Sequence, residues 1–283
     1  MFLKPEGYYL KENSETIIAL YNGTWNLSEN AIDRNRMIDV SIVSHGDRNR
    51  ADTSQWTEDN NATLLHMLTG KSGTYVAGVS THPRDFKMEA QAFNEYLEHD
   101  GVIDMLDWRK ENNALNEDAI ERYSKHVKTI FQVGDRRTED WSTILSYPIE
   151  FVPLVNPYEL SIGDTMTMKL LKNGNPLTNQ LVYHGTAHDH DHTHTEKDDH
   201  HHHYAIQLST DPLGNVSIPI DIDGVHYLRT IHMELSNTDS LTHESNWATI
   251  TFEIGHKRYT IYYILSAIVL LSIVLYLYQK YSQ

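Results

Sequence analysis

The chain contains no cysteine among its 283 residues, and basic residues are scarce. The absence of cysteine excludes disulfides, thiolate zinc sites, iron–sulfur clusters and cysteine nucleophiles. Only 23 Lys and Arg stand against 39 Asp and Glu, which gives a net charge of -16. Because non-specific nucleic-acid binding needs a basic face that neutralises phosphates, this balance argues against a nucleic-acid partner.

Sequence motifs of common enzymes are also missing. Residues 70–74 (GKSGT) superficially resemble a phosphate-binding loop, but the segment lacks the earlier glycine and does not open a helix. His243-Glu244 has no second histidine four residues later, and the chain has no Gly-x-Ser-x-Gly elbow. No nucleophile–base pair is visible, so we expect that the protein is not an enzyme.

The C-terminal segment is far more apolar than the rest of the chain. Residues 259–278 carry no charged side chain, and tyrosines stand at both ends. As a helix these residues would span about 30 Å, the thickness of the hydrocarbon core of a bilayer. We therefore predict a transmembrane helix at 259–278 and the lipid bilayer as a partner. Local charge leaves its orientation open: the protein is either tail-anchored in the cytoplasm or exported by a signal that this chain does not show.

The remainder of the sequence predicts a mostly β protein with two β-sandwich units. Residues 1–140 form the predicted N-terminal β-rich domain, with strand candidates at 17–21, 37–43, 74–79 and 129–133. Apolar residues at helical spacing predict a helical insertion at about 87–126, with a second helix that opens at Asn116 and runs through Tyr123.

Residues 146–255 predict an immunoglobulin-like β-sandwich. Seven short strand candidates alternate with turn residues such as Asn173-Gly174 and Asp223-Gly224. That number of strands in about 105 residues is typical of such a sandwich. The candidates are 150–155, 165–171, 181–183, 204–208, 216–220, 227–234 and 247–254.

Several segments of the chain, in order, resemble bacterial nickel-transport-complex subunits, a family largely described as a domain of unknown function. The matching segments cover nearly the whole soluble part: 73–78 (GTYVAG), 93–97 (FNEYL), 121–125 (ERYSK), 148–160 (PIEFVPLVNPYEL), 163–164, 174–177 (GNPL), 210–216 (TDPLGNV), 229–234 (RTIHME) and 245–253 (SNWATITFE).

The resemblance implies a secreted or membrane-tethered β-rich protein that works beside a nickel or cobalt uptake system. Family members usually begin with a signal peptide and a short His-Asp or His-Glu motif before an aromatic residue, an aliphatic residue and Pro. Residues 2–5 (FLKP) fit only the end of that motif. We therefore expect that the signal peptide is missing from this chain, that the soluble domains lie in the periplasm, and that the membrane components of a metal-uptake transporter are partners.

Residues 184–203, here called the His-rich segment, read HGTAHDHDHTHTEKDDHHHH. Imidazole suits Ni, Co, Zn and Cu, and the acidic side chains can complete a coordination shell. The segment lies between two strand candidates, so we expect a loop that can fold around divalent transition-metal ions. The resemblance favours Ni or Co as the ion, and Zn and Cu remain alternatives. The predicted metal ligands are His184, His188, His190, His192, His194, His200, His201, His202 and His203.

The same residues leave other interpretations open. The His-rich segment could be a solvated spacer or a pH sensor, since clustered imidazoles repel one another when they are protonated. His232 is either a ligand of a second site or a hydrogen-bonded sandwich residue, and His82 could approach a metal. Our leading hypothesis is a membrane-anchored extracytoplasmic accessory protein that captures divalent ions for uptake. The alternative is a membrane-tethered structural or adaptor protein in which metal binding is incidental.

Overall fold

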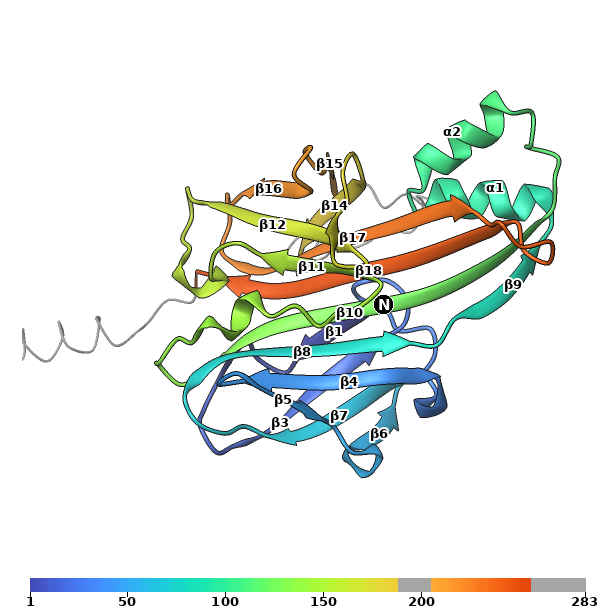
Figure 1. Cartoon of the computed structure of the whole chain (residues 1–283). Helices are drawn as coiled ribbons and strands as arrows, with labels where there is room; N and C mark the ends of the chain where they lie inside the picture. The colour runs from blue at the N-terminus through green and yellow to red at the C-terminus, as the bar shows by residue number, and fades with distance from the viewer. Residues whose placement is uncertain (188–204, 256–283) are drawn as a thin grey trace, which may run out of the picture.

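A computed structural model describes residues 1–187 and 205–255. The predicted transmembrane segment 259–278 lies outside these residues. Among the helices of the described ranges, none has the length and apolar character needed to cross a bilayer. The described chain is mostly β, with two short helices, and its strands form three sheets (Figure 1).

The largest of these sheets has ten strands and forms the middle of the molecule. Eight of its strands follow the order β15 (Ile206–Ser209), β14 (Leu181–Thr186), β17 (Gly224–Leu235), β18 (His243–Ile254), β10 (Ala119–Val133), β8 (Gly73–Thr81), β4 (Met37–Ser44) and β5 (Asp47–Arg50). Two further strands pair with β10, namely β2 (Tyr9–Leu10) and β9 (Arg84–Met88).

Two smaller sheets pack against this large sheet and make the β-sandwich. The N-terminal sheet has the order β1 (Phe2–Pro5), β3 (Glu15–Tyr21), β7 (Ala62–Leu68) and β6 (Trp56–Asp59). The C-terminal sheet contains β11 (Ile149–Pro153), β12 (Thr165–Lys172), β13 (Asn175–Pro176) and β16 (Asn215–Pro219). Short 3-10 turns occupy Arg34–Arg36, Thr53–Gln55, Glu139–Ser142 and Pro157–Glu159.

Alternation of side chains along the central strands explains why both faces of the large sheet are covered. On β8, Val76 belongs to the core shared with the C-terminal sheet, whereas its neighbours Tyr75 and Ala77 belong to the core shared with the N-terminal sheet. On β10, Ile130 and Phe131 divide in the same way. These strands are buried on both faces, which is why they read as nearly continuous apolar runs.

The predicted segments 1–140 and 146–255 share the large sheet. Strand β18 pairs in parallel with β10 over nine residues, from Glu121 opposite His243 to Thr129 opposite Thr251. Strand β18 also pairs with β17 along its whole length, from Gly224 opposite Ile254. The strands of the second segment therefore extend the sheet that the first segment begins.

The helical insertion is shorter than the sequence predicts. Helices α1 (Ala90–His99) and α2 (Ile103–Glu111) meet at Gly101, whose φ of 76° favours glycine. The predicted second helix from Asn116 through Tyr123 is wrong, because β10 begins at Ala119 and pairs there with β9. Cross-strand hydrogen bonding and burial against the helices override the helical spacing of these apolar residues.

Candidate metal centre at the root of the His-rich segment

Strand β14 leads into the His-rich segment and holds its first histidine, His184. This strand pairs with β17 on one side and β15 on the other, and His184 lies opposite Leu228 and Ile206. His184 is 5 % exposed, so the first predicted ligand lies in the core of the sandwich. Because β14 and β15 pair in antiparallel fashion, the chain leaves β14 and enters β15 at the same end of the large sheet.

A second buried histidine, His226 on β17, lies directly beside His184. The two rings are almost parallel, with an interplanar angle of 5° and centroids 5.3 Å apart, and His226 also stacks on Phe252. His184 Nε2 lies 3.0 Å from His226 Nδ1, and His226 Nε2 lies 3.1 Å from the carbonyl oxygen of Ile222. A carbonyl can only accept, so His226 Nε2 carries the proton and donates it.

This hydrogen bond fixes the tautomer of His226. With the proton on Nε2, the Nδ1 atom holds a lone pair that points at His184 Nε2. Two nitrogens that bind one ion at about 2.0–2.1 Å, with an angle between tetrahedral and square-planar values, are separated by roughly 2.9–3.4 Å. The observed 3.0 Å is the length of an N–H···N hydrogen bond without metal. The same separation would suit a shared ion if the His184 proton were on Nδ1 and the rings turned so that both lone pairs met beside the N···N line.

The remaining predicted ligands cannot be placed in the same way. His188, His190, His192, His194, His200, His201, His202 and His203 lie outside the described residues. Within residues 1–187 and 205–255, no group of three or more His, Asp, Glu or Cys side chains is arranged to hold a metal ion. The described part of the candidate centre is therefore the pair His184 and His226.

His226 was not identified from the sequence. It is a single histidine between Val225 and Tyr227, and nothing in its local pattern separates it from an ordinary strand residue. The signal that could have found it is the pairing of β14 with β17, which places Thr186 opposite His226 and so brings the start of the His-rich segment to this position.

His232 is a hydrogen-bonded residue of β17. Its Nδ1 lies 2.6 Å from Gln180 Oε1, and its Nε2 lies 2.9 Å from Lys172 Nζ and 3.2 Å from Glu234 Oε1. Burial lowers the pKa of His232 and the charge of Lys172 lowers it further, while Glu234 acts in the opposite direction. The ring is already engaged on both nitrogens, which favours the structural interpretation.

His82 lies in the exposed turn between β8 and β9, where its backbone N–H donates to the carbonyl oxygen of Arg36 at 2.7 Å. It takes no part in a described group of three ligands.

Comparison with known proteins places the chain in a family but does not supply a function. A family model described as "Domain of unknown function (DUF4198)" matches residues 1–234. The search of curated proteins found no match. Among solved structures, the chain is similar to the D0-D1 domain of intimin, with 11% identity, a TM-score of 0.22, and coverage of 88% of this chain and 96% of that one.

Two further structures show similarity of the same order. The D00-D0 domain of intimin has 10% identity and a TM-score of 0.19, with coverage of 90% and 98%. Latent PorU from Porphyromonas gingivalis has 10% identity and a TM-score of 0.20, with coverage of 89% of this chain and only 20% of that one. All three TM-scores are low, and none bears on function.

Proposed function

We propose that this chain, which belongs to the DUF4198 family, is a metal-binding accessory protein. In this proposal the His-rich segment captures divalent transition-metal ions for a nickel or cobalt uptake system. The observation that carries the proposal is the buried pair His184 and His226, whose nitrogens lie 3.0 Å apart where the His-rich segment leaves the sheet. A sheet-bound pair of histidines at the start of a ligand-rich segment would supply the fixed part of an ion site.

The surroundings of the pair resemble those of metal-binding histidines in general. Such a histidine usually donates its second ring N–H to a backbone carbonyl or carboxylate, and this partner fixes the ring orientation. His226 does so through Ile222, while stacking on Phe252 restrains its rotation. His226 Nδ1 and His184 Nε2 would hold the ion, and the histidines and acids of 188–203 would complete its shell.

The charge of the His-rich segment supports ion capture. It contains five acidic residues and one lysine, so its net charge with neutral histidines is 1 − 5 = −4. This charge concentrates cations around the segment. The usual affinity order would place copper first, with nickel and zinc close behind. Nickel or cobalt is favoured here by the sequence resemblance alone.

The cellular setting is part of the same proposal. The apolar, tyrosine-flanked segment 259–278 supports a membrane anchor, and the resemblance supports a periplasmic location beside the membrane components of a transporter. An anchored loop would raise the ion concentration near the transporter without a dedicated high-affinity carrier.

Titration calorimetry of the full chain in mild detergent at pH 7.5, with Ni²⁺ as the titrant, tests the capture role. One variant replaces 188–203 with Gly and Ser residues of equal length, and a second carries His226→Gln. His66→Gln is the matched control, because His66 is an exposed histidine on β7, in the N-terminal sheet.

We expect the loop replacement to remove most of the sites. His226→Gln should weaken the tightest site about 10- to 100-fold, and the control should behave as the wild type. If the loop replacement leaves both stoichiometry and affinity unchanged, the segment is not the capture element, and the adaptor alternative is favoured.

A further inference from the structure

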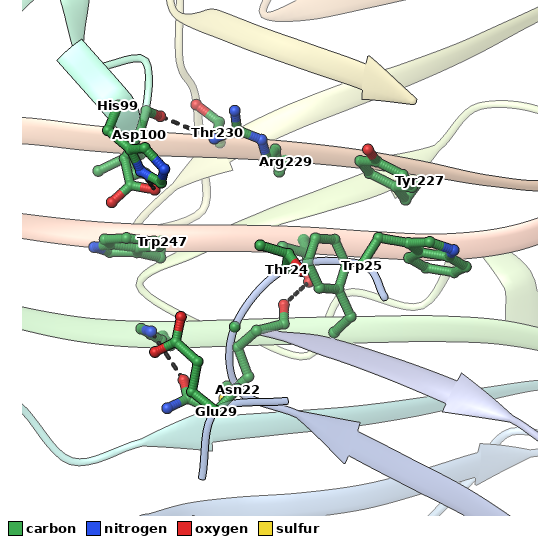
Figure 2. A pocket seen from close by; sticks show the side chains of 16 residues that line it. Asn22, Thr24, Trp25, Glu29, His99, Asp100, Tyr227, Arg229, Thr230 and Trp247 are labelled. Carbon is green, nitrogen blue, oxygen red and sulfur yellow. Dashed lines mark hydrogen bonds and ion pairs between the residues drawn. The ribbon is translucent and has the colours of Figure 1, made fainter. Parts of the chain in front are cut away.

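A cavity of about 310 Å³ lies on the opposite face of the large sheet from the histidine pair. Alternation along β17 separates the two features, because His226 and Leu228 point to the C-terminal sheet while Tyr227 and Arg229 line the cavity. Figure 2 shows the cavity between β17, β18 and β10, with the loop 22–29 and the end of α1 closing its sides. Its volume is at the lower end of the range for small-molecule sites.

Aromatic side chains form one wall of this cavity. Trp25 and Tyr227 are stacked, with ring centroids 5.1 Å apart and an interplanar angle of 14°. Phe2 meets both of them edge-on, at 5.5 and 5.2 Å. Trp25 and Tyr227 are each only 6 % exposed, so neighbouring residues hold them in place. A rigid aromatic wall suits the flat apolar part of a ligand.

Two cations line the cavity without an acidic partner. Lys125 Nζ donates to Asn22 Oδ1 at 3.0 Å and lies 4.6 Å from the centre of the Trp247 ring. Arg229 Nη1 donates to the carbonyl oxygen of Asp100 at 2.9 Å. Among the described residues, neither side chain forms an ion pair with an Asp or Glu. Burial lowers the pKa of Lys125, and the charges of Asp100, Glu29 and Glu121 act against this shift.

Asp100 and Glu29 line the cavity and act on Lys125 through their charge, but neither forms an ion pair with Lys125 or Arg229. Asp100 faces His99, with Nδ1 and Oδ1 3.6 Å apart, and it raises the pKa of that histidine. Glu29 is exposed, and Figure 2 shows it beside Asn22, which accepts the hydrogen bond from Lys125 Nζ. Lys125 and Arg229 are half-buried, and a partly desolvated cation without a paired anion is costly, so an incoming anion would relieve that cost.

We propose that this cavity binds a small organic carboxylate with a flat apolar body. The carboxylate would accept hydrogen bonds from Lys125 and Arg229, and the apolar body would pack on the Trp25–Tyr227 wall. An Arg or Lys that bonds a carboxylate in a desolvated site forms a stronger hydrogen bond than a neutral pair does. This site is independent of the His-rich segment and of the proposed role in metal capture.

The probe for this proposal is 3-phenylpropanoate, with its uncharged amide, 3-phenylpropanamide, as the isosteric control. Both are titrated into the full chain in detergent at pH 7.5 with a chelator present, so the result does not depend on metal. Binding is followed by calorimetry and by tryptophan fluorescence, since Trp25 and Trp247 line the site. The variants are Lys125→Met and Arg229→Met, and Lys110→Met makes the same charge change on the exposed surface of α2.

We expect saturable binding of the carboxylate and at least about tenfold weaker binding of the amide. Each cavity variant should lower carboxylate affinity about tenfold or more, and Lys110→Met should leave it unchanged. If Lys125→Met does not fold, Lys125→Arg replaces it and should retain binding. The proposal is overturned if the wild type does not bind the carboxylate, if acid and amide bind equally, or if the folded cavity variants bind as the wild type does.

Discussion

The most severe single substitution we predict removes a buried ion pair between the large sheet and the C-terminal sheet. Lys128 on β10 and Glu150 on β11 are each 2 % exposed, with Nζ and Oε2 3.0 Å apart. Lys128 Nζ also donates to the carbonyl oxygens of Thr143 and Phe151, at 2.9 and 3.0 Å. Burial lowers the pKa of Lys128, and Glu150 acts against this shift. The ammonium therefore depends on three acceptors that water cannot replace.

Lys128→Met would leave the Glu150 carboxylate buried without its cation. We expect a loss of about 3–5 kcal/mol in the free energy of unfolding, the usual result of breaking one side of a buried pair. Glu150→Gln keeps an acceptor for the backbone N–H of Leu145, but it leaves the lysine charge uncompensated. The double variant carries no charge at this site, so it should be more stable than the sum of the two single losses predicts, by about 2 kcal/mol.

Urea unfolding of the full chain in detergent, followed by tryptophan fluorescence at pH 7.5, measures all four proteins of this cycle. Lys110→Met controls for loss of a lysine charge on the surface, and it should change stability by less than about 0.5 kcal/mol. Additive losses in the double variant, within about 0.5 kcal/mol, would show that the two side chains do not compensate each other and would refute the reasoning.

Two further predictions concern pH. His126 is buried against Ser80, and burial lowers its pKa to about 4, below the unfolded value of about 6.5. The unfolded chain therefore binds a proton first on acidification, so stability should fall between pH 6.5 and 4, by up to roughly 3 kcal/mol from this residue. His126→Gln should show a shallower loss in urea midpoints across that range, and an equal loss would exclude His126 as the cause. Nickel affinity of the wild type should fall at least about tenfold between pH 7.5 and 5.5, because ions must displace imidazole protons; an unchanged affinity would remove histidine as the main ligand.

Local sequence patterns predict most of the strands correctly. The alternating segments 37–43, 165–171 and 216–220 correspond to β4, β12 and β16, because each has one face in the core and ends at turn residues. The turn at Asn173-Gly174 is confirmed by positive φ at both residues, 48° and 78°. These features depend only on residues close in the chain, which is why the sequence is sufficient for them.

Features that depend on distant pairing could not be predicted in this way. The parallel pairing of β10 with β18 joins residues 122 positions apart, such as Glu121 and His243, and no local signal specifies it. That pairing makes one large sheet from two predicted segments and turns Asn116–Tyr123 from an apparent helix into the approach to a strand. The partnership of His184 with His226 and the cavity beside Lys125 are consequences of the same register. Composition identified the His-rich segment, but only the fold shows that His226 lies beside its first histidine, His184.

The last prediction concerns Gly185, which lies between the two candidate sites: it follows His184 on β14 and lies opposite Tyr227 on β17. A Cβ at this position would clash with the Tyr227 ring, which forms part of the cavity wall. Gly185→Ala should displace the Tyr227 ring from its stacked position on Trp25 and cost about 1–3 kcal/mol of stability through overpacking. Because the cavity wall moves, 3-phenylpropanoate should bind more weakly, while the number of nickel ions bound should stay the same. Gly7→Ala, where the added Cβ would make only an ordinary contact with Leu10 Cδ2 at 3.7 Å, controls for loss of a glycine. Unchanged carboxylate affinity in a folded Gly185→Ala protein would mean that the Trp25–Tyr227 wall does not contact the ligand.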